Sequence, residues 1–186
     1  EEIKPVSYNS VVGKINLESV AIRLIVLRHC PDAAGNPDAR GVLEAVNIGA
    51  SKGLNIKDLG DFRITPNGGT ELRRKVVWQA ASNDKFAGLK EFISEQMKVD
   101  AVPGDTMIIY TMGHGGGDGL LVTLGQRKEI LKVIAEAAEE NSQETLWWSM
   151  NCHADAYLPR INTLNETQQE LVSVLPTSTA HDLSWF

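Results

Sequence analysis

Three short runs of almost wholly apolar residues place the strongest constraint on what this chain can fold into. They are Ala21–Leu27, Thr106–Met112 and Thr145–Met150, and each has the length and the β-branched or aromatic content of a strand. Nearly continuous apolar strands are typical of a parallel sheet whose two faces are covered by helices. Helix-length segments separate the runs, as connections between parallel strands require. The sequence therefore predicts an α/β fold, a three-layer α/β/α sandwich around a mostly parallel sheet.

Weaker patterns complete the predicted order of elements. The further strands expected are Phe62–Thr65 and Leu171–Leu175, and Leu120–Leu124 is expected to be a brief strand or a hairpin arm. Apolar residues at helical spacing predict helices over about Ala39–Ser51, from Thr70 to Ala80, from a cap at Asn83 to Met97, and over Gln126–Glu140. The pattern before Ala21 is weak. We therefore predict an N-terminal extension over residues 1–20 and one folded domain over residues 21–186.

Composition excludes several classes of protein. With 186 residues, of which 42% are hydrophobic, the chain suits one domain with one core. The net charge of −6, from 18 Lys+Arg and 24 Asp+Glu, disfavours binding to nucleic acid or to an anionic membrane. No apolar run approaches the roughly 20 residues of a membrane-spanning helix. The two cysteines, Cys30 and Cys152, are too few for a disulfide scaffold. An enzyme or a binding domain is left, in a compartment that the sequence does not indicate.

A histidine and a cysteine follow two of the predicted strands. His114 lies in a glycine-rich stretch just after Met112, and Cys152 comes two residues after Met150. Ligands of open α/β sheets bind beyond the carboxyl ends of the strands, and one helix between the two strands makes them expected neighbours. Cysteine plus histidine is the minimum for nucleophilic acyl transfer. The glycines beside His114 let a substrate carbonyl approach main-chain N–H groups, which can form an oxyanion hole.

This arrangement resembles the caspase-like (clan CD) cysteine peptidases. In that family one hydrophobic block precedes a His-Gly pair, here His114-Gly115, and a second precedes the nucleophilic cysteine, here Cys152. The glycine run is similar to that of clostripain, and Cys152-His153 is similar to the Cys-His pair of metacaspases. The caspase signature Gln-Ala-Cys-x-Gly is not present, because Met150-Asn151-Cys152-His153-Ala154 stands in its place.

The resemblance implies a cysteine endopeptidase with a caspase-like fold and no cofactor or metal. It assigns His114 as the general acid and base, Cys152 as the nucleophile, and the N–H groups of Gly115 and Cys152 as the oxyanion hole. It also implies a protein or peptide substrate and activation by cleavage, including autoprocessing. The family core has a last strand that would follow Phe186, so a second fragment of the same precursor is left open as a partner.

Substrate preference rests on three charged residues. Asp118 and Asp155 lie close in sequence to the two catalytic candidates and would suit an acidic pocket for Arg or Lys before the cut. Both residues serve equally well as helix caps or solvated loop acids. Arg40 stands where caspases carry an arginine for acidic substrates, although a surface role explains it too. The sequence favours, weakly, a basic residue before the cut.

Other readings of the same residues remain. Gly49-Ala50-Ser51-Lys52-Gly53 matches the serine elbow of α/β-hydrolases, but Ser51 precedes the glycine-rich stretch and is expected at a helix end. A zinc site drawn from His114, Cys152, His153 and His181 lacks the short ligand spacing of structural sites. His29 and Cys30 follow the first strand and are expected to be ordinary loop residues. The alternative to an enzyme is a catalytically silent caspase-like binding or scaffold module.

Overall fold

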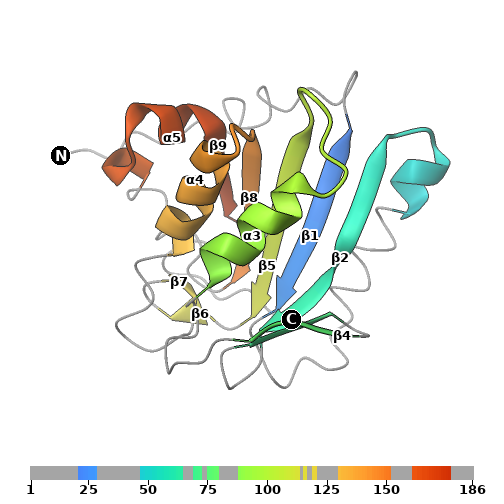
Figure 1. The fold of residues 1–186 in the computed structure, drawn as a ribbon, viewed down its shortest axis with the longest axis horizontal. Coiled ribbons are helices and arrows are strands. Elements are labelled where there is room, and N and C mark those ends of the chain that lie inside the picture. The colour runs from blue at the N-terminus through green and yellow to red at the C-terminus, as the bar shows by residue number, and fades with distance from the viewer. Residues whose placement is uncertain are drawn as a thin grey trace.

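A computed structural model describes residues 21–28, 47–64, 69–72, 75–79, 88–113, 115–116, 119–120, 130–151 and 161–176. Its main sheet has seven strands in the order β4-β3-β2-β1-β5-β8-β9 (Figure 1). These strands are β1 (Ile22–Arg28), β2 (Ile56–Ile64), β3 (Gly69–Leu72), β4 (Lys75–Gln79), β5 (Thr106–Gly113), β8 (Thr145–Asn151) and β9 (Val172–Pro176). The helices are α3 (Leu89–Lys98), α4 (Ile130–Glu140) and α5 (Glu166–Leu171). A separate pair is formed by β6 (Gly115–Gly116) and β7 (Gly119–Leu120).

Five adjacent strands of the sheet are parallel. They are β2, β1, β5, β8 and β9, and each pairs in parallel with its neighbour. The predicted parallel sheet is thereby confirmed. β3 and β4 continue the sheet beyond β2 as antiparallel strands. From β1 the chain moves outward to β2, β3 and β4. It then crosses through α3 to β5, on the other side of β1, and continues to β8 and β9. The strand order therefore reverses at β1.

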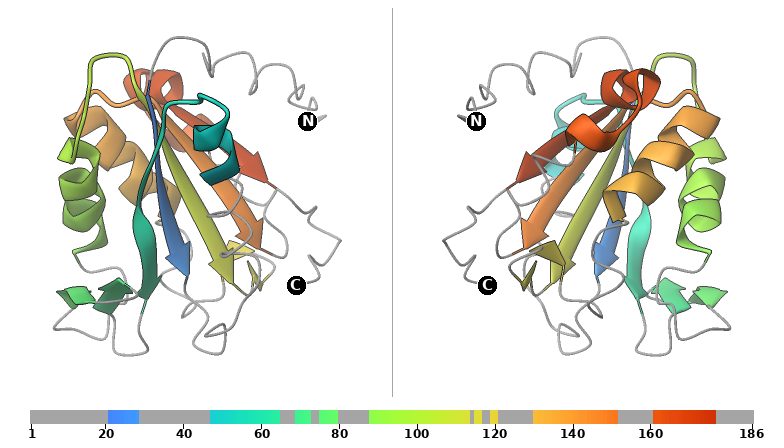
Figure 2. Two further views of the ribbon diagram at one scale, coloured as in Figure 1. Left: turned by 90° about the vertical axis from the view of Figure 1, so that its right-hand side faces the viewer. Right: turned by 90° about the vertical axis from the view of Figure 1, so that its left-hand side faces the viewer.

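Helices flank this sheet. α3 and α4 lie side by side on one face, as the edge-on views of Figure 2 show. The helical turn at 47–51 lies on the opposite face, where a Cβ atom on Gly49 would stand 3.0 Å from the Ile56 side chain of β2. Right-handed crossovers place connecting helices on opposite faces when the order of strands reverses. The position of the helices thus follows from the reversal at β1.

Both faces of the parallel strands are buried, which explains their nearly continuous apolar sequences. Toward α3 and α4 the sheet presents Ile25, Leu27, Phe62, Met107, Ile109, Trp147, Val172 and Val174. On the other face Leu24, Val26 and Tyr110 are also at most 3% exposed. Phe62 of β2 packs edge-on against Phe92 of α3, with ring centroids 4.9 Å apart. The helices therefore add an apolar layer to a sheet that is buried on both sides.

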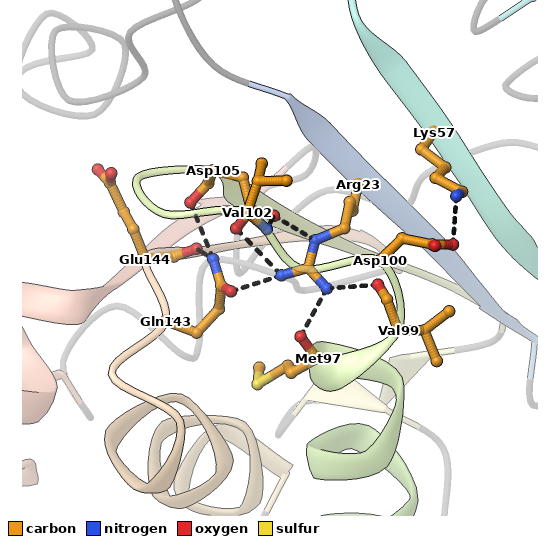
Figure 3. Close-up of polar contacts among 9 residues, drawn as sticks. All are labelled: Arg23, Lys57, Met97, Val99, Asp100, Val102, Asp105, Gln143 and Glu144. Atoms are coloured by element: carbon orange, nitrogen blue, oxygen red, sulfur yellow. Dashed lines mark hydrogen bonds and ion pairs between the residues drawn. The ribbon is translucent and has the colours of Figure 1, made fainter.

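A buried arginine ties the amino ends of three elements together. Arg23 of β1 is 0% exposed and forms an ion pair with Asp105, its Nε lying 2.6 Å from Oδ2 (Figure 3). Its guanidinium also donates to the carbonyl oxygens of Met97 and Val99 at the end of α3, and to Oε1 of Gln143 before β8. These contacts satisfy a charge that would otherwise be costly to bury. They also fix where β1, β5 and β8 begin.

Three local predictions need correction. The helix expected from Thr70 to Ala80 is wrong, because Gly69–Leu72 and Lys75–Gln79 form the antiparallel strands β3 and β4. The helix expected from Asn83 begins later, at Leu89, after an N-cap at Gly88. The helix α5 was not predicted. Asn165 caps it by accepting from the Gln168 N–H while Gln168 accepts from the Asn165 N–H, a capping box.

The predictions for β1, β5, β8, β9 and α4 are confirmed by the described residues of these elements. The strand expected over Phe62–Thr65 is the end of a longer strand, since β2 begins at Ile56, and Thr65 lies outside the described residues. The predicted helix over Ala39–Ser51 is helical over 47–51, and its first part lies outside the described residues. The same holds for residues 1–20, expected as an extension, and for the part of the expected strand after Leu120.

Candidate functional site

The candidate site is built on the carboxyl ends of β5 and β8. These strands are parallel neighbours, and their register runs without a shift from Met107↔Thr145 to Gly113↔Asn151. Gly113 and Asn151 are the last residues of the two strands and directly precede His114 and Cys152. The expectation that these two strands are neighbours is therefore confirmed. The two strands therefore end side by side at the same edge of the sheet.

A small hairpin follows β5 after one residue. β6 and β7 pair antiparallel, with Gly115 opposite Leu120 and Gly116 opposite Gly119 (Figure 1). Three of the four paired positions are glycines, which carry no Cβ atom. At these positions no side chain of the hairpin itself stands between its N–H and C=O atoms and an approaching group.

The strand order marks this edge as the place for a ligand. In open α/β sheets ligands bind beyond the carboxyl ends of the strands, at the point where the strand order reverses. Here the order reverses at β1, and β5 lies directly beside it on the side of β8. From β1 the chain goes on to the helical turn at 47–51, and from β5 it goes on to α4 on the opposite face (Figure 2). The carboxyl end of β5 therefore borders the switch point.

Side chains on both faces hold β5 and β8 together just below this edge. On the α4 face, Trp147 Nε1 donates a hydrogen bond of 2.9 Å to Oγ1 of Thr111. On the opposite face, the rings of Tyr110 and Trp148 pack edge-on with centroids 5.0 Å apart. Both Trp147 and Tyr110 are fully buried. The relative position of the two strands is therefore fixed by packing as well as by main-chain hydrogen bonds.

The structure describes only some of the residues that the sequence nominates for the site. Gly115 is the first residue of β6, two residues beyond the end of β5. The other residues that the sequence nominates lie outside the described residues: His114, Cys152, Asp118, Asp155 and Arg40. The same is true of His29, Cys30, His153 and His181, which entered the competing readings. The predicted roles of these residues stay predictions.

Ser51, the residue that mimics a hydrolase elbow, lies elsewhere. It is the last residue of the helical turn at 47–51, before β2. Its hydroxyl donates a hydrogen bond of 2.7 Å to the carbonyl oxygen of Ile48. β2 starts five residues later, so Ser51 lies toward the amino edge of the sheet, away from the ends of β5 and β8. The expectation that Ser51 belongs to a helix end is confirmed.

One feature of the site is not predicted by the sequence. The hydrogen bond between Thr111 and Trp147 joins side chains 36 positions apart, and only a threonine within an apolar run hints at it. The hairpin is predicted in part: the sequence favours a strand or hairpin arm over Leu120–Leu124, and the pairing of β6 with β7 lies within the glycine-rich stretch and ends at Leu120. Across the part of the chain that the structure describes, no three His, Cys, Asp or Glu side chains gather as a metal site would require.

The described helices include none with the length and apolar character needed to cross a membrane. No protein-family model matches the chain, and no significant match is found among curated proteins or among solved structures. A functional assignment therefore has to be argued from the sequence motifs and the sheet edge that carries them.

Proposed function

We propose that this protein is a cysteine endopeptidase whose Cys152 and His114 act as a catalytic dyad at the carboxyl edge of the sheet. The proposal includes a three-layer α/β/α sandwich of the caspase-like kind. The strand order β2-β1-β5-β8-β9, with α4 between β5 and β8, supports this finer description. The turn at 47–51 on the face opposite α3 and α4 supports it too.

The observation that carries the proposal is the register of β5 and β8. Gly113 and Asn151 lie opposite each other at the ends of adjacent parallel strands. If that register continued by one residue, it would pair His114 with Cys152, since neighbouring strands lie about 4.8 Å apart. Side chains alternate between faces along a strand, so the proposal puts both residues on the face that carries Tyr110 and Trp148. An imidazole and a thiol would then meet without any rearrangement of the sheet.

The proposed chemistry follows from these two groups. A free thiol, with an ordinary pKa of about 8.5, is mostly protonated at neutral pH, and a nearby imidazole raises its thiolate fraction. The Cys152 sulfur attacks the peptide carbonyl carbon, and the resulting oxyanion accepts hydrogen bonds from the N–H groups of Gly115 and Cys152. The C–N bond breaks as His114 gives a proton to the departing amine. Water, deprotonated by His114, then attacks the thioester and releases the acid and the free thiol.

The substrate in this proposal is a protein or peptide with a basic residue before the cut. Asp118 and Asp155 would supply negative charge to the pocket for that residue, since each follows one of the two strands by only a few positions. If Arg40 lined the pocket in place of these two aspartates, the pocket would prefer an acidic residue before the cut. The net charge of −6 favours approach of cationic peptides over anionic ones.

A peptide library tests the proposal. Fluorogenic peptides with Arg, Lys, Asn or Asp before the cut are incubated with the wild-type chain, with Cys152→Ala and with the matched control Cys30→Ala. We expect cleavage by the wild type and by Cys30→Ala, fastest for Arg or Lys, and none by Cys152→Ala at an unchanged melting temperature. Cleavage that survives Cys152→Ala would exclude this residue as the nucleophile.

Thiol labelling distinguishes the enzyme from a silent binding module. With iodoacetamide, a catalytic Cys152 should react much faster than Cys30 at neutral pH, because reactivity follows the thiolate fraction. Equal and slow labelling of the two thiols, together with no cleavage of any peptide, would favour a module that binds without catalysis.

A further inference from the structure

A buried side-chain hydrogen bond crosses from β8 to β5 close to their carboxyl ends. Trp147 Nε1 donates 2.9 Å to Oγ1 of Thr111, and the two residues are 0% and 2% exposed. The register partner of Trp147 is Ile109, so the indole reaches a diagonal neighbour two residues farther along β5. Such diagonal neighbours lie about 7–8 Å apart across a sheet, which a long aromatic side chain can span.

This hydrogen bond is specific to one register of the two strands. A slip of one residue would exchange the two faces of β8, so that Trp147 would no longer share a face with Thr111. A slip of two residues would bring the indole diagonal to Ile109 or Gly113, and neither has a side-chain acceptor. A buried indole N–H without an acceptor costs about 1–3 kcal/mol. The bond therefore reinforces the register that pairs Gly113 with Asn151.

The presence of threonine at position 111 supports a specific use of its hydroxyl. Valine has the same shape and suits a fully buried strand better, because burying a hydroxyl is unfavourable unless it is hydrogen-bonded. The register partner of Thr111 is Ser149, which is also fully buried. Two hydroxyl residues thus lie opposite each other two positions before the ends of β5 and β8, beside the apolar side chains of Ile109 and Trp147.

We infer that Thr111 and Trp147 are positioning residues for the catalytic dyad, an inference that rests on the proposed peptidase function. Thr111 precedes His114 by three residues and Trp147 precedes Cys152 by five. The bond between them holds the last residues of β5 at a fixed level relative to those of β8. In this inference the buried bond between Thr111 and Trp147 determines the distance between the imidazole of His114 and the thiol of Cys152. A small misplacement of catalytic groups is enough to lower turnover by one or two orders of magnitude.

The test uses variants that change this bond while preserving shape. Thr111→Val removes the acceptor, Thr111→Ser keeps it, and Trp147→Phe removes the donor. The matched control is Thr145→Val, on the same strand as Trp147 but at the opposite edge of the sheet. Its hydroxyl is also buried and donates 3.0 Å to the carbonyl oxygen of Gln143, so its loss has a comparable structural cost.

The measurements are kcat and KM for the best peptide, the melting temperature, and the rate of Cys152 alkylation as a function of pH. For Thr111→Val we expect kcat to fall on the order of tenfold with KM nearly unchanged, and the alkylation profile to shift toward that of a free thiol. Thr111→Ser should restore both. Thr145→Val should lower the melting temperature similarly but leave kcat and the alkylation profile as in the wild type. In a Trp147→Phe background, Thr111→Val should lower kcat no further.

The outcomes separate the two proposals. Wild-type kcat and an unshifted profile in Thr111→Val, or an equal loss of kcat in Thr145→Val, would overturn the positioning role while the peptidase function stands. If Thr111→Val does not fold, Trp147→Phe answers the same question, with wild-type kcat overturning the role. A wild-type chain that cleaves no peptide and whose Cys152 reacts no faster than Cys30 would overturn the peptidase function, and the positioning role with it.

Discussion

Arg23 and Asp105 form an ion pair inside the protein, with two contacts of 2.6 and 3.0 Å between guanidinium and carboxylate. The carboxylate also accepts from the main-chain N–H of Val102, and Gln143 bonds both to Arg23 and to the Asp105 carbonyl. Figure 3 shows these groups converging from the start of β1, the start of β5 and the segment before β8. The amino edge of the sheet is thus held by a buried polar cluster.

Removing one partner of this pair should destabilise the fold strongly. We expect Asp105→Ala to lower the free energy of unfolding by about 3–5 kcal/mol, because it leaves the Arg23 charge buried without its counterion. Urea-induced unfolding followed by tryptophan fluorescence measures the change. The control is Lys57→Met, which breaks the exposed ion pair with Asp100 and should cost at most about 1 kcal/mol. Equal losses in the two variants would contradict the buried character of the Arg23 pair.

Asn165 should be a measurable contributor to the C-terminal part of the sheet. Asn165→Ala removes the N-cap of α5 and the hydrogen bonds to Glu139 of α4, so we expect a loss of about 1–2 kcal/mol. Thermal unfolding measures it against Asn162→Ala, an exposed position outside the cap. Asn165→Asp keeps a capping oxygen but places a second carboxylate beside Glu139, and it should fall between the wild type and the alanine variant. A fully neutral Asn165→Ala would contradict the capping box.

Gly53 ends the helical turn at 47–51 with a φ of +89°. A side chain there meets nothing within 4 Å, so the cost of substitution is backbone strain alone. We expect Gly53→Ala to lower the free energy of unfolding by about 1–2 kcal/mol, and Gly53→Asn to cost less, because asparagine tolerates positive φ better. Chemical denaturation of the two variants checks this order. An alanine variant as stable as the wild type would show that the turn relaxes to negative φ.

His114 should affect turnover far more than stability if it is the general acid and base. We expect His114→Ala to lower kcat by about 10²–10⁴-fold, the range typical of a lost proton-transfer group. Its melting temperature should stay close to that of the wild type, and steady-state kinetics with differential scanning fluorimetry measures both. His153→Ala is the matched control at the neighbouring motif and should keep most of the activity. Full activity in His114→Ala would remove this residue from the mechanism.

The sequence predicted the parallel strands well because burial on both faces leaves a strong local signature. Six of the seven residues of Ala21–Leu27 and four of the six residues of Thr145–Met150 are apolar, a pattern that burial on both faces of a sheet favours. The hairpin β3–β4 was predicted wrongly as a helix because Leu72, Val76 and Val77 also fit helical spacing. The β-branched and aromatic run Val76-Val77-Trp78 was the better signal, since these residues favour strands.

Long-range contacts were beyond the sequence for a physical reason. Nothing in the local sequence distinguishes Arg23, near the start of β1, from an arginine that reaches solvent at a strand end. Its partners come from positions 74 to 120 residues away and are brought together only by the complete sheet. By contrast, the adjacency of the ends of β5 and β8 can be predicted, because two local apolar patterns are joined by one crossover helix. The sequence could therefore indicate the candidate edge, but not the bond between Thr111 and Trp147 beneath it.

The reversal of strand order at β1 has a consequence for how such a protein can diversify. The chain leaves β1 toward one face and β5 toward the other, so the segments bordering the edge belong to separate halves of the fold. Insertions after β1 and after β5 would then extend opposite faces of the sheet independently, with no change in the strands between them. Each face can lengthen by itself while the parallel strands stay as they are.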